Sequence, residues 1–208
     1  MKIILFGADG RTGSEVLRLA LARGFDVRAF VRSMPPVPHK EVEYCVGDVL
    51  VPETVKPAVA GVDAVVSVIG HISGSDPRLQ TKGITNIITA MQAAGVERLI
   101  SMTGAGVTDP DDVPQGGGVI LTKLINLIDK DRIADGREHA EVIRRSGTNW
   151  TIVRCPKLTN RPRTGEYQTG YIKAGLFNTI ARADVADFIL RCLENREYIH
   201  AAPIIVSE

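Results

Sequence analysis

The fold of this chain is decided by Lys2-Ile3-Ile4-Leu5-Phe6-Gly7-Ala8-Asp9-Gly10-Arg11-Thr12-Gly13, near the start of the sequence. Residues 2–6 form a short apolar run, and apolar residues at helical spacing follow the glycines, so the stretch predicts a strand, a tight turn and a helix. Glycines at this spacing let the backbone approach a pyrophosphate, whose charge the helix N-terminus favours. A plain strand-to-helix turn is the alternative. The predicted cofactor contacts here are Gly7, Asp9, Gly10, Arg11, Thr12 and Gly13.

Strand and helix patterns alternate along the rest of the chain. Apolar runs predict strands at residues 25–31, 42–46, 62–69, 97–102 and 150–154, and helical patterns cover residues 52–59, 79–94, a region ending near 145, and 182–193. Residues 203–207 predict an edge strand. Continuous apolar strands alternating with helices are typical of a parallel sheet covered on both faces. The sequence therefore predicts the α/β class: one Rossmann-type, doubly wound domain over residues 1–208, with a mainly parallel sheet.

Length, charge and composition narrow the functional classes. The 208 residues suffice for one core, and 25 basic and 24 acidic residues are interspersed with a net charge of +1, which argues against a nucleic-acid partner. No apolar stretch approaches the roughly 18 residues that span a bilayer, so we expect no membrane or secretory role. The widely spaced Cys45, Cys155 and Cys192 predict reduced thiols and no metal site. We expect a cytoplasmic protein, monomeric or a small homo-oligomer.

The end of the second predicted strand indicates which dinucleotide is bound. An acidic side chain there would accept hydrogen bonds from the ribose hydroxyls of NAD, whereas a basic one would bind the 2'-phosphate of NADP. This chain has Arg32-Ser33 and no acid, and Arg11 in the glycine-rich turn is a second cation. The pattern predicts NADP(H) as the cofactor. A solvated surface arginine is the alternative interpretation of Arg32.

Two further strand ends carry candidate cofactor contacts. Asp48-Val49 follows the third strand, where Asp48 either meets the adenine amino group or caps the helix near residue 52. Gly70-His71 follows the fourth strand, on the edge of a parallel sheet where ligands bind, although His71 could instead be solvated. We expect the substrate site to be built from the loops after strands four to six and the C-terminal part.

With these motifs assembled, the chain resembles the atypical short-chain dehydrogenase/reductase group of NAD(P)H-binding proteins, and within it the flavin reductases of the biliverdin reductase B type. The resemblance implies a Rossmann fold, a preference for NADPH and reduction of flavins, quinones or tetrapyrroles. It covers nearly the whole chain. The residues that carry it are Gly7 to Gly13, Val31-Arg32, Val46-Gly47-Asp48-Val49-Leu50, residues 59–65, Ser146-Gly147, Pro162-x-Thr164-Gly165-x-Tyr167 and Phe188-x-Leu190-Arg191-Cys192-Leu193.

Departures from this group define the candidate catalytic residues. None of the four tyrosines has a lysine four residues later, so the usual Tyr-x-x-x-Lys proton relay is missing. The flavin reductases carry a Thr-Ser pair after the fifth strand, and here only Thr103 is kept. After the late strand they carry histidine, where this chain has Pro156-Lys157-Leu158. Thr103 and Lys157 are therefore the candidate catalytic residues. The predicted cofactor contacts in these two segments are Thr103, Pro156, Lys157 and Leu158.

Three other features of the sequence are candidates for a functional or a structural role. Residues 108–114, followed by three glycines, are predicted to form either a lid over the site or a surface loop. His139 lies between Glu138 and Glu141 on a helix without metal-ligand spacing, which favours a solvated face. Trp150 begins a predicted buried strand and is expected in the core.

The leading functional hypothesis is an NADPH-dependent reductase that transfers hydride to a small planar acceptor such as a flavin, quinone or tetrapyrrole. In such chemistry most of the rate can come from positioning the two rings. The alternative is a non-catalytic sensor of NADP(H) that resembles the NmrA-like proteins and acts through a protein partner. Epimerisation of a nucleotide sugar is disfavoured, because that chemistry normally uses the missing tyrosine and a larger C-terminal domain.

Overall fold

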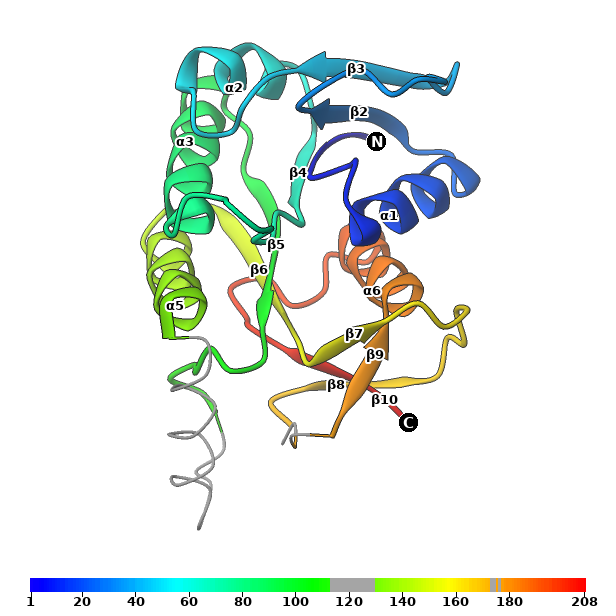
Figure 1. Ribbon diagram of the computed structural model, residues 1–208, viewed down its shortest axis with the longest axis vertical. Coiled ribbons are helices and arrows are strands. Elements are labelled where there is room, and N and C mark those ends of the chain that lie inside the picture. The colour runs from blue at the N-terminus through cyan, green and yellow to red at the C-terminus, as the bar shows by residue number, and fades with distance from the viewer. Residues whose placement is uncertain (113–129, 173–174, 176) are drawn as a thin grey trace.

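The computed structural model of the chain describes residues 1–112, 130–172, 175 and 177–208. Among these residues, one sheet has the strand order β3-β2-β1-β4-β5-β6-β10-β8, and a small second sheet pairs β7 with β9 (Figure 1). The strands are β1 (Lys2–Phe6), β2 (Asp26–Val31), β3 (Val42–Val46), β4 (Ala64–Ser67), β5 (Arg98–Gly104), β6 (Asn149–Cys155), β7 (Lys157–Thr159), β8 (Tyr167–Gly170), β9 (Thr179–Ala181) and β10 (Ile204–Ser207). The helices are α1 (Arg11–Ala22), α2 (Pro52–Val59), α3 (Leu79–Ala94), α5 (Lys130–Arg144) and α6 (Arg182–Glu194).

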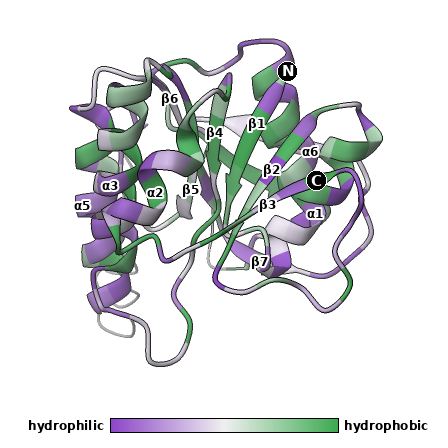
Figure 2. Cartoon of the chain, turned by 90° about the horizontal axis from the view of Figure 1, so that it is seen from above, coloured by the Kyte–Doolittle hydropathy of each residue, from purple (hydrophilic) through white to green (hydrophobic). Residues whose placement is uncertain are grey.

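Helices cover both faces of the large sheet, as Figures 1 and 2 show. Successive side chains of a strand point to opposite faces, so Ile3 and Leu5 of β1 pack with residues of α1 and α6, whereas Ile4 and Phe6 pack with residues of α2, α3 and α5. All strand pairs from β3 to β6 are parallel. The α/β prediction of a doubly wound, mainly parallel sheet is therefore confirmed.

The C-terminal part of the sheet differs from the prediction. The strand predicted at the sheet edge, β10, lies between β6, to which it is parallel, and β8, to which it is antiparallel. β8 was not predicted, because its sequence Tyr-Gln-Thr-Gly is short and lacks an apolar run. β7 and β9, three residues each, were missed for the same reason.

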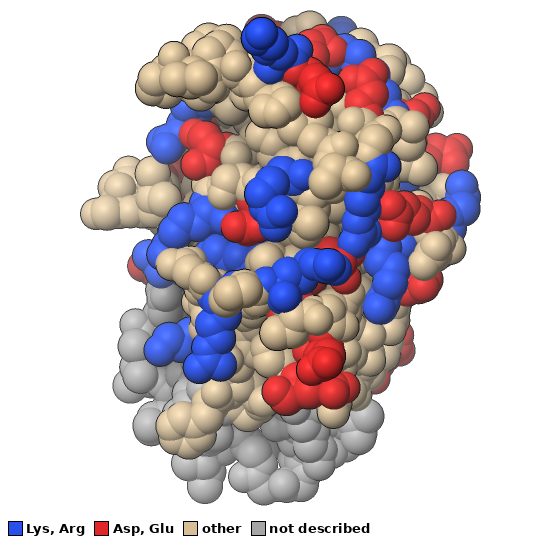
Figure 3. All heavy atoms as spheres, turned by 90° about the vertical axis from the view of Figure 1, so that its right-hand side faces the viewer, with Lys and Arg blue, Asp and Glu red and all other residues tan. Residues whose placement is uncertain are grey.

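Acidic and basic side chains are mixed on the face that carries α1 and α6 (Figure 3). Several of its cations are paired, including Arg23 with Asp187 and Glu194, and Arg163 with Asp187. Among the described residues, no helix combines the length and the hydropathy needed to cross a bilayer.

The two outer glycines of the first turn are required for different geometric reasons. Gly7 has a φ of +82°, a backbone conformation that other residues rarely adopt. A Cβ atom on Gly13 would lie 1.9 Å from the carbonyl oxygen of Gly7 and 2.8 Å from the Cα of Ala8. Only glycine at position 13 therefore lets α1 approach the end of β1 this closely.

Replacing Gly13 with alanine tests this close approach. Helix propensity alone predicts a gain of about 1 kcal/mol, but the contact with the Gly7 carbonyl cannot be relieved by a side-chain rotation, so we expect a net loss of about 2 kcal/mol or more in the free energy of unfolding. Urea unfolding measures the change. The control is Gly104→Ala, where the added Cβ meets nothing within 4 Å and which should shift stability by less than about 0.5 kcal/mol. Equal stability of the two variants would contradict the argument.

Candidate functional site

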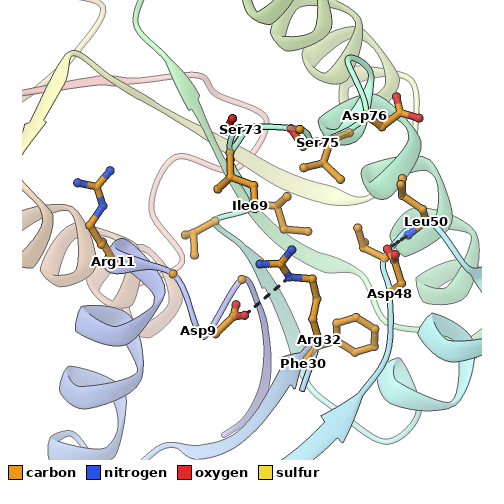
Figure 4. Close-up of a pocket in the computed structure, with 18 residues that line it drawn as sticks. Asp9, Arg11, Phe30, Arg32, Asp48, Leu50, Ile69, Ser73, Ser75 and Asp76 are labelled. Carbon is orange, nitrogen blue, oxygen red and sulfur yellow. Dashed lines mark hydrogen bonds and ion pairs between the residues drawn. The ribbon is translucent and has the colours of Figure 1, made fainter. Parts of the chain in front are cut away.

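A cleft of about 590 Å³ lies at the carboxyl ends of β1 to β4 (Figure 4). Its walls are the glycine-rich turn after β1, the ends of β2 and β3, and the loop between β4 and α3. This is the edge of a parallel sheet at which the strand order reverses, with β1 flanked by β2 and β4, and ligands bind there in open α/β sheets. The predicted cofactor residues that line the cleft are Gly7, Asp9, Gly10, Arg11, Arg32, Asp48, Val49 and Gly70.

The glycine-rich turn presents the N-terminus of α1 to this cleft. Gly10 is the N-cap residue and no side chain caps the helix, so the first helical amides are available to an anion. Thr12 and Gly13, by contrast, are buried and do not line the cleft. The turn therefore has the geometry that a dinucleotide pyrophosphate requires: glycine at the point of close approach and an uncapped helix N-terminus.

The two cations predicted at the cleft are both exposed. Nε of Arg32 lies 4.0 Å from a carboxylate oxygen of Asp9, and their side chains are 69% and 44% exposed (Figure 4). An exposed ion pair of this length contributes little energy, so Asp9 does not compete strongly with a phosphate for Arg32. Arg11 extends away from this pair. Ser33 is also exposed, but it does not line the cleft.

Asp48 does not cap α2. The N-cap residue of that helix is Val51, and no side chain caps it. Asp48 instead accepts a hydrogen bond of 2.9 Å from the Leu50 amide, which fixes the turn after β3 while Asp48 stays exposed on the cleft wall (Figure 4). Of the two interpretations offered by the sequence, the helix cap is thus wrong, and the adenine contact remains a prediction.

A second cavity of about 380 Å³ adjoins the cleft, with which it shares Gly70. It lies beyond the ends of β5 and β6, next to α5, β7 and the start of α6. Among the predicted residues it is lined by His71, Thr103, Pro156 and Leu158. Lys157 is exposed and does not line either cavity. Neighbouring side chains of a strand point in opposite directions. Because Leu158 lines the cavity, the adjacent Lys157 does not reach the cofactor and acceptor site where the sequence predicted it.

Thr103 occupies the carboxyl end of β5 and is only 4% exposed. Within the described part of the chain, no hydrogen bond joins its Oγ1 to a backbone group, as a strand-end hydroxyl often forms. The neighbouring Cys155 thiol also lines the cavity, and burial raises its pKa to about 12. Since the thiolate is the reactive form, Cys155 is not a nucleophile here.

Because Thr103 lines the second cavity, its hydroxyl is a polar group that a bound ligand can reach.

His71 is held by a polar network rather than solvated. Its Nε2 lies 2.8 Å from Oδ2 of Asp135, its Nδ1 lies 3.3 Å from Oγ of Ser75, and its side chain is 8% exposed. Asp135, which is 2% exposed, also accepts hydrogen bonds from the amides of Gln80 and Thr81. The network ties the loop after β4 to α5. No sequence pattern points to Asp135, which lies 64 residues from its histidine partner.

The prediction that His139 lies on a solvated face is wrong. His139 is 2% exposed, and its Nε2 lies 2.9 Å from Oγ of Ser101 in β5. Its neighbours Glu138 and Glu141 are on the solvated side of α5, which suggested the same for the histidine. Burial lowers the pKa of His139 to about 4, so the ring is neutral at physiological pH. Trp150, at 9% exposed, lies in the core as expected.

Part of the predicted lid can be located. Asp109 is paired with Arg144 of α5, and Asp112 with the buried Arg154 of β6. These ion pairs fasten residues 109–112 to the body of the fold. Residues 113–118, the remainder of the predicted segment, lie outside the described residues.

The NAD(P)H-binding family model matches residues 7–196 of the chain. The chain belongs to the NAD(P)H-binding family. This match confirms the family resemblance and the assignment of NAD(P)H as the cofactor. It spans both cavities, from the glycine-rich turn to the end of α6.

Several proteins resemble this family member over most of its length. YwnB, an uncharacterized protein of Bacillus subtilis, is 29% identical over 100% of this chain and 99% of its own. An NAD(P)H azoreductase of Xenophilus azovorans is 28% identical over 73% of this chain, which spans 46% of the azoreductase. ChuY of Escherichia coli O157:H7, an anaerobillin reductase, superposes with a TM-score of 0.81 at 20% identity, covering 100% of this chain and 97% of ChuY. The last likeness confirms the Rossmann-type fold.

The buried His139 makes stability depend on pH. Its pKa is about 4 in the folded protein and ordinarily 6.5, so between these values the unfolded chain binds a proton that the folded chain does not. This contribution to the free energy of unfolding is complete above pH 6.5 and falls by about 1.4 kcal/mol per unit as the pH drops toward 4.

Urea unfolding between pH 4 and 7.5 measures this slope. We expect His139→Gln to flatten the slope relative to the wild type, whereas the matched variant His39→Gln, which replaces an exposed histidine, leaves it unchanged. A His139→Gln protein with the wild-type pH dependence would contradict the assignment.

Proposed function

We propose that this protein is an NADPH-dependent reductase that transfers hydride to a small planar acceptor bound in the second cavity. The observation that carries the proposal is the continuity of the two cavities. The cleft with the pyrophosphate-binding geometry meets, at Gly70, a second cavity that combines apolar side chains with polar and basic ones. Among its polar groups is the Thr103 hydroxyl, which forms no hydrogen bond within the described part of the chain. A dinucleotide in the cleft needs such a neighbouring space for its redox partner.

The residues of the chain supply binding and orientation. When NADPH is bound, its nicotinamide supplies the hydride. The α1 N-terminus and Arg32 hold the phosphates, while Met102, Val107 and Leu158 provide apolar contact for a flat ring. The hydroxyl of Thr103 donates a hydrogen bond to the acceptor, where it stabilises the negative charge that develops as hydride arrives. No other protein acid is required, because positioning supplies most of the rate.

The azoreductase likeness supports a reductase acting on flat aromatic molecules. The family supports NAD(P)H as the reductant. A preference for NADPH over NADH rests on Arg32, which has no acid beside it at the end of β2 and only a long, exposed ion pair with Asp9.

Arg32 is tested by its effect on the two cofactors separately. In Arg32→Ala we expect the Kd for NADPH to rise about tenfold or more, since a charge-assisted phosphate contact is lost, and the Kd for NADH to change less than about threefold. Fluorescence titration of each cofactor measures both constants. Arg18→Ala is the matched control: Arg18 is an exposed α1 arginine paired with Glu15. Equal weakening of NADPH and NADH binding would contradict the role of Arg32.

Turnover is tested by following NADPH oxidation with riboflavin, FMN, menadione and an azo dye as acceptors. We expect Thr103→Val, which is nearly isosteric, to lower kcat about tenfold or more while the Kd for NADPH stays within about threefold; Thr103→Ser should retain most activity. Lys157→Ala should have little effect, because Lys157 does not line the cavity. A large loss in Lys157→Ala would restore it as a catalytic residue. Tight NADPH binding without turnover on any acceptor would overturn the proposal and favour a sensor.

A further inference from the structure

Basic side chains outnumber acidic ones in the described lining of the second cavity. Its described lining contains two arginines, Arg132 and Arg182, and a histidine, but no aspartate or glutamate. The cofactor cleft differs, because three carboxylates, those of Asp9, Asp48 and Asp76, line it together with Arg11 and Arg32. Among the described lining residues, the carboxylates thus face the cofactor cleft and not the second cavity.

Arg182 is the unusual member of this lining. It is the first residue of α6, directly after β9, and is 8% exposed. Its Nη1 donates a hydrogen bond of 2.6 Å to Oδ1 of Asn160, which is a neutral partner. Among the described residues, no carboxylate forms an ion pair with Arg182. Within the part of the chain that the structure describes, this buried guanidinium thus lines the cavity without a counter-charge.

The buried Arg154 and the half-buried Arg98 have more hydrogen-bond partners than Arg182 among the described residues, although Nε of Arg98 has none. Arg154, at 1% exposed, forms a two-pronged ion pair with Asp112 and donates to the carbonyls of Ala202 and Val107. Arg98 has no carboxylate partner, but it donates to four backbone carbonyls and to the hydroxyl of Thr151. Among the described residues, Arg182 has one hydrogen bond, to the neutral Asn160, and neither an ion pair nor a bonded carbonyl.

A buried charge without a partner destabilises a protein. Burial lowers the pKa of Arg182, and the nearby positive charge of Arg11 lowers it further, which agrees with the lack of an acid close by. An arginine held here at a cost in stability is best explained by an anion that arrives with the ligand.

We propose that the acceptor reduced by this protein carries a carboxylate or phosphate group, and that Arg182 binds this group in the second cavity. The inference rests on the proposed function, since it assigns the charge of the acceptor at the same site. The planar guanidinium matches the two oxygens of either anion. A ring system that fits about 380 Å³ can then lie against the apolar wall with its anionic substituent at Arg182.

Pairs of acceptors with the same ring and different charge test this inference. FMN and riboflavin differ by a phosphate, and methyl red and 4-dimethylaminoazobenzene differ by a carboxylate. In the wild type we expect kcat/KM for at least one charged member to exceed that of its neutral partner by about tenfold or more. In Arg182→Gln this ratio should fall to near one, because kcat/KM falls for the charged acceptor and stays unchanged for the neutral one. Which pair responds distinguishes phosphate from carboxylate.

Two further variants separate binding of the anion from a structural effect. Arg182→Lys keeps the charge and should retain part of the preference. Because an unpaired buried charge is removed, Arg182→Gln should keep or raise the Tm, whereas Arg154→Gln, which breaks a compensated pair, should lower it. The inference would be overturned if Arg182→Gln kept the wild-type ratio of kcat/KM between charged and neutral acceptors. It would also be overturned if the Kd for NADPH rose by the same factor by which kcat/KM for the charged acceptor fell.

A binding experiment keeps this inference distinct from the proposed function. Quenching of flavin fluorescence measures the affinities of FMN and riboflavin for the protein saturated with NADP⁺, with no turnover required. Preference for FMN that depends on Arg182, without NADPH oxidation, would leave the anion site standing and refute the reductase. Turnover with equal preference for charged and neutral acceptors would refute the anion site and leave the reductase standing.

Discussion

The contact between the backbone of Gly7 and the first turn of α1 is the constraint on which the site depends. No side chain fits at position 13, so the helix starts directly against the end of β1. The uncapped N-terminus of α1 consequently opens into the cleft at the carboxyl edge of the sheet. A side chain here would push the helix away and remove both the space and the amides that a pyrophosphate needs.

The order of the strands then determines what lies beside the cofactor. Because β5 and β6 continue the parallel sheet beyond β4, their ends form a second cavity next to the cleft. α5 closes it from one side: Gly136 of α5 lies so near Thr103 that an added Cβ would come within 3.0 Å of its hydroxyl oxygen. The Asp135 and His71 hydrogen bond fastens the loop after β4 to the same helix. The two cavities thus share one rigid boundary.

Buried polar residues divide into two kinds in this chain. Arg154, Arg98 and Asp135 have several partners each and hold loops or strands to the body of the fold. Thr103 and Arg182 line the second cavity and lack such compensation among the described residues. Groups of the first kind stabilise the fold, whereas groups of the second kind are left for a ligand to satisfy. The two kinds of residue do not differ in burial, but they differ in the number of their hydrogen-bond and ion-pair partners among the described residues.

The α/β class, the glycine-rich turn and eight of the residues that line the cofactor cleft follow from the sequence alone, because these depend on local periodicity and on residues adjacent along the chain. Only the tertiary structure decided that His139 is buried, that β10 is an inner strand and that Lys157 turns away from the cavity that Leu158 lines. The same holds for Arg182, which sequence reasoning placed in no site. Partners such as His71 and Asp135 are 64 residues apart, and no local pattern encodes a contact that forms when distant strands and helices pack together.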